Sequence, residues 1–80
     1  MQDIKDFIFV HPDMQSGEPL FKGTRVPVYS LFMHLEEGVS LDDFLEDFPS
    51  VTREQAIAVL EWSKAKIYEA AAWRKPTQTT

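Results

Sequence analysis

Residues 17–28 read GEPLFKGTRVPV, and they are the most distinctive part of the chain. Gly17 to Pro19 has the composition of a turn, and Leu20-Phe21-Lys22 can form a short second strand. Gly23 then predicts a bend at a backbone angle that other residues avoid. The segment therefore predicts two backbone bends and a fixed approach into the helix that follows.

A first strand is predicted just upstream, at residues 7–10, which read FIFV. Aromatic and β-branched residues favour a strand, and His11-Pro12 ends it because proline cannot continue a ladder. Residues 20–22 can pair with this strand within the chain, closing a hairpin, or across a dimer. We expect an N-terminal β arm over residues 7–22.

Two helices are predicted next, over residues 27–37 and 41–47. Pro27 suits the first turn of a helix and Gly38 is typical of a helix C-terminus. Ser40 predicts an N-cap, and Pro49 ends the second helix. The apolar residues repeat at helical spacing. They are Val28, Leu31, Phe32 and Leu35 in the first helix, and Leu41, Phe44, Leu45 and Phe48 in the second.

A third, longer helix is predicted from Arg53 to about Trp73. Thr52 and Gln55 form a capping box, and no proline follows until Pro76. The predicted buried stripe comprises Ala56, Ile57, Leu60, Ile67 and Ala71. Residues 77–80 are polar, and we expect them to fray.

The predicted fold class is mainly α, in a single domain of 80 residues. It is a three-helix helix-turn-helix (homeodomain-like) bundle over residues 27–73, with a short N-terminal β-strand or hairpin arm. Many three-helix bundles share this pattern without touching DNA, so the pattern alone predicts no function.

Composition narrows the class of protein. The chain has no cysteine, a net charge of −5 and no apolar run near the ~20 residues of a membrane helix. We expect a cytoplasmic protein that binds neither membranes nor nucleic acid in general. A small core without staples often gains stability by oligomerising, so a homodimer or a complex is expected.

Catalytic chemistry is not predicted. His11 and His34 lack triad or zinc-site spacing, and three scattered glycines build no phosphate loop. We expect no enzyme activity, no metal, no cofactor and no small-molecule substrate. Six acids without a base lie in residues 36–47, as either a solvated face or a patch for a basic partner protein. They are Glu36, Glu37, Asp42, Asp43, Glu46 and Asp47.

Two sets of residues are candidates for binding. The DNA candidates place the start of the third helix in the major groove, where Arg53 reads guanine and Gln55 adenine. Capping and surface roles for both are equally consistent with the sequence. Arg25 either anchors the hairpin or meets phosphate. The DNA set is Lys22, Arg25, Thr52, Arg53 and Gln55. The candidates for a partner or dimer interface, or for packing under the hairpin, are Phe7, Phe9, Trp62, Tyr68 and Trp73.

Ordered motifs give the chain a resemblance over roughly residues 7–70. Val10-His11-Pro12 comes first, followed by GEP at residues 17–19 and GTRVPV at residues 23–28. Single characteristic residues then follow in a fixed order. The structural residues of this pattern are Gly17, Pro19, Gly23, Thr24, Arg25, Pro27, Gly38, Pro49 and the Thr52 cap. In this respect the chain resembles the domain of unknown function 433 family. His11 and Glu18 depart from the family, which often has Asp and a basic residue there.

The resemblance implies a homeodomain-like helical domain that is usually dimeric. It also implies the antitoxin half of a toxin–antitoxin pair, with a PIN-like ribonuclease as partner and repression of its own operon. Two hypotheses remain open. One is a DNA-binding antitoxin, and the other is a protein-interaction module or structural homodimer that does not touch DNA.

Overall fold

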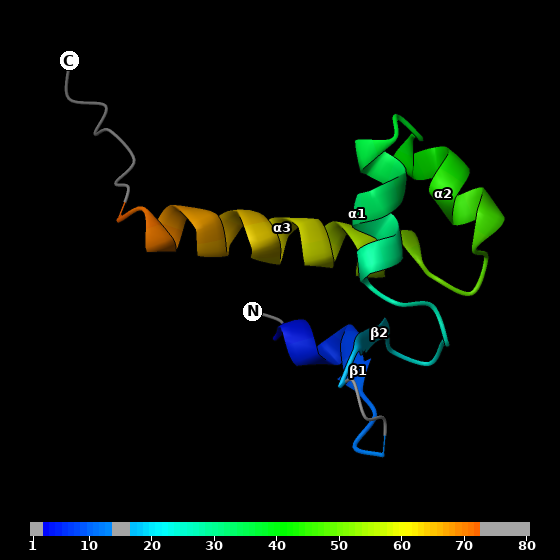
Figure 1. The fold of residues 1–80 in the computed structure, drawn as a ribbon, viewed down its shortest axis with the longest axis horizontal. Helices are drawn as coiled ribbons and strands as arrows, with labels where there is room; N and C mark the ends of the chain where they lie inside the picture. The colour runs from blue at the N-terminus through cyan, green and yellow to red at the C-terminus, as the bar shows by residue number, and fades with distance from the viewer. Residues whose placement is uncertain (1–2, 14–16, 73–80) are drawn as a thin grey trace.

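The computed structural model describes residues 3–13 and 17–72 (Figure 1). Three helices and an N-terminal two-stranded hairpin confirm the coarse prediction. A short 3-10 helix, η1, precedes the hairpin and was not predicted from the sequence. The elements in order are η1 (Ile4–Asp6), β1 (Ile8–Val10), β2 (Pro19–Phe21), α1 (Tyr29–Glu36), α2 (Leu41–Asp47) and α3 (Arg53–Ala70). None of the helices in the described part of the chain is long and apolar enough to cross a membrane.

The hairpin closes within the chain. β1 and β2 are antiparallel, with Phe9 opposite Leu20. Leu20 also forms a bridge with Pro27 on the other side of β2. This bridge holds Pro27 in extended pairing, so α1 begins at Tyr29 and not at Pro27 as predicted.

The turn after β2 is held by Thr24. Its Oγ1 donates to the carbonyl of Phe21 at 2.9 Å and accepts from the backbone N–H of Val26 at 2.9 Å. Gly23 has a φ of 80°, the left-handed angle that the sequence predicted. Arg25 is exposed, so Thr24, and not Arg25, fixes the segment between the hairpin and α1.

The helix ends follow local chemistry. Gly38, with a φ of 88°, directly follows Glu37, the C-cap residue of α1. The Ser40 hydroxyl accepts from the N–H of Asp43 at 3.1 Å, and α2 has the bounds predicted for it. The Thr52–Gln55 capping box is present at the start of α3. α3 ends at Ala70, earlier than the predicted end near Trp73, since Ala71 is its C-cap and Ala72 has a φ of 54°. Trp73 and residues 77–80 lie outside the described residues.

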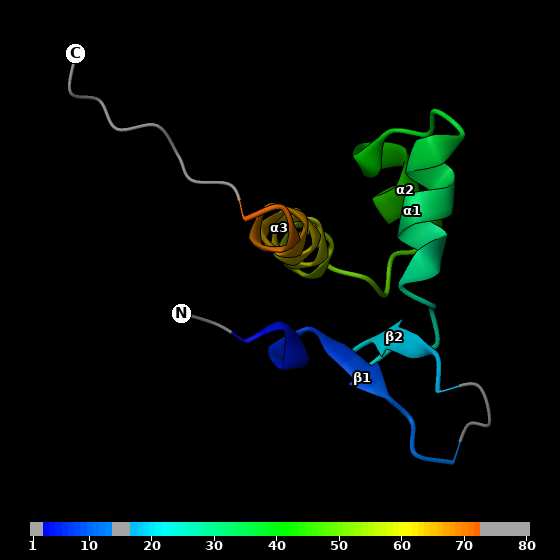
Figure 2. The same ribbon diagram turned by 60° about the vertical axis from the view of Figure 1, so that its left-hand side comes forward.

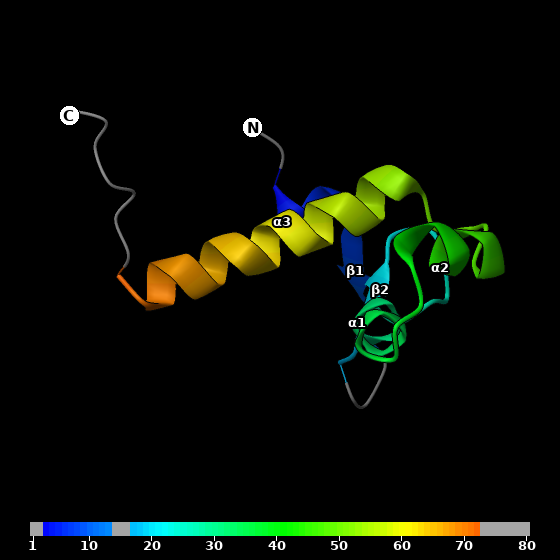
Figure 3. The same cartoon turned by 90° about the horizontal axis from the view of Figure 1, so that it is seen from above.

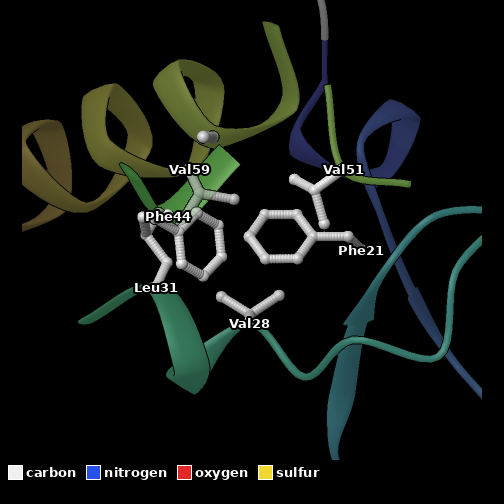
Figure 4. Close-up of a cluster of buried hydrophobic side chains, with 7 residues drawn as sticks. Phe21, Val28, Leu31, Phe44, Val51 and Val59 are labelled. Atoms are coloured by element: carbon white, nitrogen blue, oxygen red, sulfur yellow. The ribbon is translucent and has the colours of Figure 1, made fainter. Parts of the chain in front are cut away.

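The core lies where the hairpin, α1, α2 and the start of α3 meet (Figure 4). Phe21, Leu31 and Phe44 are fully buried at its centre. Around them pack Val28, Val51, Ala56 and Val59. His34 lies at the boundary of the core, where it is partly buried. Its Nδ1 lies 2.6 Å from the carbonyl oxygen of Ser30, and its ring meets those of Phe44 and Phe48 edge-on.

The predicted buried stripe of α3 is largely wrong. Of its five members only Ala56 is buried, and Ile67 is 64% exposed. The buried positions are Gln55, Ala56 and Val59. The reason is that only the first turns of α3 reach the core, through Ala56 and Val59. Figure 2 looks almost along α3 and shows the hairpin below the helix, with α1 and α2 to one side.

Gln55 joins α3 to the hairpin. Its side chain is 9% exposed, and its Oε1 accepts from the N–H of Thr52 at 2.9 Å. Its Nε2 donates to the carbonyl of Lys22 at 2.9 Å and to that of Phe7 at 3.3 Å. One side-chain amide therefore caps α3 and also donates to the carbonyl that precedes β1 and to the carbonyl that follows β2.

We predict that Gln55→Ala lowers the free energy of unfolding by about 1–3 kcal/mol, because the carbonyls of Phe7 and Lys22 lose the Gln55 amide as a donor and the helix loses half of its capping box. Chemical denaturation monitored by circular dichroism measures this. Glu61→Gln, an exposed change on the same helix, is the control and should cost less than about 0.5 kcal/mol. Equal, small effects of the two changes would contradict the role of Gln55.

Candidate interaction surfaces

The DNA candidates do not form one free basic surface. Gln55 is buried, and its side-chain amide is hydrogen-bonded to the backbone of Thr52, Phe7 and Lys22. This argues against the base-reading role predicted for Gln55, because reading adenine would break the contact with the hairpin. The hydroxyl of Thr52 accepts from the N–H of Gln55 at 3.0 Å, as a helix cap.

Arg53 lies at the start of α3 but is paired. Its guanidinium contacts the carboxylate of Asp42 on α2, and both side chains are exposed. Asp43, Glu46 and Asp47 are exposed on the same short helix. The start of α3 is therefore flanked by acids that would repel phosphate.

The remaining DNA candidates, Lys22 and Arg25, lie together on the hairpin. Both are exposed, and with His11 they line a shallow groove of about 890 Å³. Neither is paired with a carboxylate among the described residues. Asp13 shares the groove, so its charge is mixed.

The second half of α3 projects beyond the rest of the fold (Figures 1 and 3). Every described residue from Lys64 onward is exposed. At a rise of 1.5 Å per residue, the projecting part up to Ala70 is about 10 Å long. It carries the ion pairs Glu61–Lys64 at 3.0 Å and Lys66–Glu69 at 3.5 Å. A half-helix with neither core nor neighbour gains little from packing, so a partner that covers it would stabilise it.

Large apolar side chains lie on this exposed helix. Trp62 is 44% exposed and Tyr68 is 48% exposed. Beside Trp62, an apolar groove of about 460 Å³ runs between η1 and α3. We call it the α3 groove, and its apolar lining is Ile4, Phe7, Ile57, Ala58, Trp62 and Ala65.

A second apolar groove of about 360 Å³ lies along β1. We call it the β1 groove, and its apolar lining is Ile4, Ile8, Phe9, Val10 and Trp62. Ile4 and Trp62 line both grooves, so the two are adjacent. An extended apolar surface of this kind marks an interaction site more often than chance exposure.

The interface residues predicted from the sequence fall mostly on this surface. Phe9 and Trp62 are exposed on it, and Phe7 is buried in the wall of the α3 groove. Tyr68 is exposed further along α3 and lines neither groove. Trp73 lies outside the described residues. Ile4 and Ile57 were not predicted. Ile57 was assigned to the buried stripe, and Ile4 belongs to the 3-10 helix that the sequence analysis missed.

Comparison with known proteins places the chain in a family. A family model described as "Protein of unknown function (DUF433)" matches residues 8–62. The chain is also 35% identical over 51 residues to the uncharacterized protein y4eO of Sinorhizobium fredii, which covers 64% of this chain. The match spans only 23% of that relative's own length. No solved structure matches. Since the family model covers more than half of the chain, the protein belongs to the DUF433 family of proteins of unknown function.

Proposed function

We propose that this protein is a protein-binding domain that acts as an antitoxin, and that it holds its toxin on the exposed apolar face of α3. The observation that carries the proposal is the projecting half of α3 beside the α3 groove. Trp62 stands at the junction of the two, with nearly half of its surface exposed.

The physical case rests on the surface that a partner would remove from water. Trp and Tyr are enriched at interface hot spots because they bury large areas at a small cost in conformational entropy. Trp62 and Tyr68, each about half exposed, lie within two turns of one another on α3. A partner that covers both also stabilises the helix that carries them.

The charge of the molecule supports a basic partner. Six of its acids lie in residues 36–47, and those on α2 are exposed. A surface of this sign speeds association with a positively charged protein and slows association with DNA. A PIN-like ribonuclease is the toxin implied by the family resemblance. It would need a basic surface to bind its RNA, and such a surface would be attracted to the exposed acids of α2.

DNA binding and the homeodomain-like helix-turn-helix role are less well supported. Gln55 is committed to the fold, Arg53 is paired with Asp42, and only Lys22 and Arg25 remain of the five DNA candidates. Two phosphate contacts per chain predict weak binding that salt would abolish. We therefore place toxin binding first and leave operator DNA out of the proposal.

We predict that Trp62→Ala weakens binding to a PIN-like ribonuclease of the same genome by about 30-fold, the loss expected of a hot-spot residue. Isothermal titration calorimetry measures the Kd, and suppression of the ribonuclease's toxicity in growing cells reports the same interaction.

The matched control is Tyr29→Ala, because Tyr29 on α1 is 51% exposed but lies outside both grooves. It should leave the Kd unchanged. The assignment of the site is contradicted if Tyr29→Ala costs as much as Trp62→Ala. The antitoxin role is contradicted if no PIN-like ribonuclease of the genome binds the wild-type protein.

A second prediction concerns DNA. In a fluorescence-anisotropy titration against a duplex of its own upstream region, the protein should show no binding that survives a random-duplex competitor, even at low salt where attraction is greatest. Arg53→Ala should change nothing. Competitor-resistant binding that is lost in Arg53→Ala would restore the repressor hypothesis.

A further inference from the structure

We propose that the outer edge of β1 pairs with β1 of a second copy of this chain, so that two hairpins join into one four-stranded antiparallel sheet. The twofold axis would pass beside Phe9. This inference goes beyond toxin binding, since it concerns a different partner and the backbone edge of β1, and it stands if toxin binding fails. Trp62 borders both surfaces.

The direction of the backbone groups identifies the free edge. The N–H of Phe21 donates to the carbonyl of Val26 at 3.0 Å, and the carbonyl of Pro19 accepts from the N–H of Val28 at 3.0 Å. Both residues thus turn away from β1. Their partners across the hairpin, Ile8 and Val10, form non-hydrogen-bonded pairs with them and must turn their own N–H and C=O groups to the outer side.

Within residues 3–13 and 17–72, this outer side is unpaired. No hydrogen bond joins the backbone of Ile8 or Val10 to another described residue on that side. Proteins usually protect such edges with lysine, proline or a bulge, because an open edge recruits other strands. The three residues of β1 include none of these, since they read Ile-Phe-Val, and both Phe9 (44%) and Val10 (49%) are exposed. Lys5 and Lys22 line the groove beside the strand and are not part of it.

The edge is complementary to itself. In an antiparallel pair with Phe9 opposite Phe9, Ile8 of each copy faces Val10 of the other. Both are the residues whose backbone groups point outward, so the register forms four hydrogen bonds without a mismatch. Pro12 has no N–H, and this limits the pairing to the three residues of β1. A second copy of β1 matches this edge in length and in the spacing of its hydrogen-bonding groups, whereas a peptide of arbitrary sequence is not constrained to do so.

The side chains suit the same register. Phe9 and its copy would form a non-hydrogen-bonded pair, in which Cα atoms lie about 4.5 Å apart and aromatic side chains interact favourably. The antiparallel direction also brings Lys5 of one copy toward Asp13 of the other. Both are exposed, and neither has an ion-pair partner among the described residues. Opposite charges therefore lie at the same end of the new strand pair, with Lys5 on η1 of one copy and Asp13 beyond β1 of the other.

The strand alone is too small for a stable interface. A specific contact buries roughly 800 Å² per partner, and three residues of strand supply only part of this. The β1 groove, with Ile4 and Trp62 in its lining, lies alongside the edge and adds apolar surface to it. A four-stranded sheet is also more stable than the isolated two-stranded hairpin, which is marginal in water.

The test uses sedimentation equilibrium of the full chain across a range of concentrations. We expect the mass of two chains for the wild type and of one chain for Val10→Pro. That change removes an outward N–H and leaves the hydrogen bonds between β1 and β2 in place. Val10→Thr, which keeps the N–H and a β-branched side chain, should remain dimeric. Circular dichroism must show the same helix content in all three.

A crosslink provides a second measurement in case Val10→Pro fails to fold. The chain has no cysteine, so Phe9→Cys introduces a single thiol. Facing Cys residues at a non-hydrogen-bonded pair are close enough for a disulfide, and mild oxidation should give a covalent dimer. Tyr29→Cys, at a similarly exposed position on α1, should crosslink at least tenfold more slowly.

Two results would overturn the proposal. One is a wild-type chain that sediments as a monomer at every concentration. In that case an extended segment of another protein, and not a second copy, would pair with the edge of β1. The other is a dimer in which Phe9→Cys crosslinks no faster than Tyr29→Cys, which would place the contact elsewhere.

Discussion

The side-chain amide of Gln55 is the contact on which the arrangement of this fold depends. It lies at the one point where the hairpin, the turn after β2 and the start of α3 meet, and it bonds to all three. A buried amide that lost these partners would leave several polar groups unsatisfied at once. The orientation of α3 against the hairpin is therefore set by hydrogen bonds as much as by the apolar core.

That orientation divides α3 into two parts. The first turns pack on Phe21 and Phe44 through Ala56 and Val59, and the rest continues into solvent. The same contact holds β1 under α3 with its outer edge open and Trp62 beside it. The two interaction surfaces proposed above thus follow from one structural cause. The packed core fixes the angle between α3 and β1, and it is too small to cover the distal half of α3 or the outer edge of β1.

Local chemistry made most of the element boundaries predictable. Ser40 and Pro49 bracket α2, and the Thr52–Gln55 box marks the start of α3. The buried face of α3 was not predictable, because periodicity favours the apolar Ile57 and Ile67 and gives no sign that the polar Gln55 is buried. The start of α1 was missed because Pro27 pairs with Leu20, a tertiary contact. For Trp62 and Tyr68 the sequence left open an interface role or packing under the hairpin, and both are about half exposed. The open edge of β1 was not predictable, because it depends on which side of β1 the strand β2 lies.

Amide hydrogen exchange along α3, measured by NMR on the dilute protein, tests the central claim that Gln55 anchors only the first part of this helix. Residues 57–60 should exchange only when the whole domain unfolds, whereas residues 66–70 should exchange much faster through local opening of the projecting half. In Gln55→Ala the protection of residues 57–60 should fall toward that of the projecting half. Uniform, high protection from residue 57 to residue 70 in the wild type would contradict this account, because it would mean that the distal half is supported without a partner.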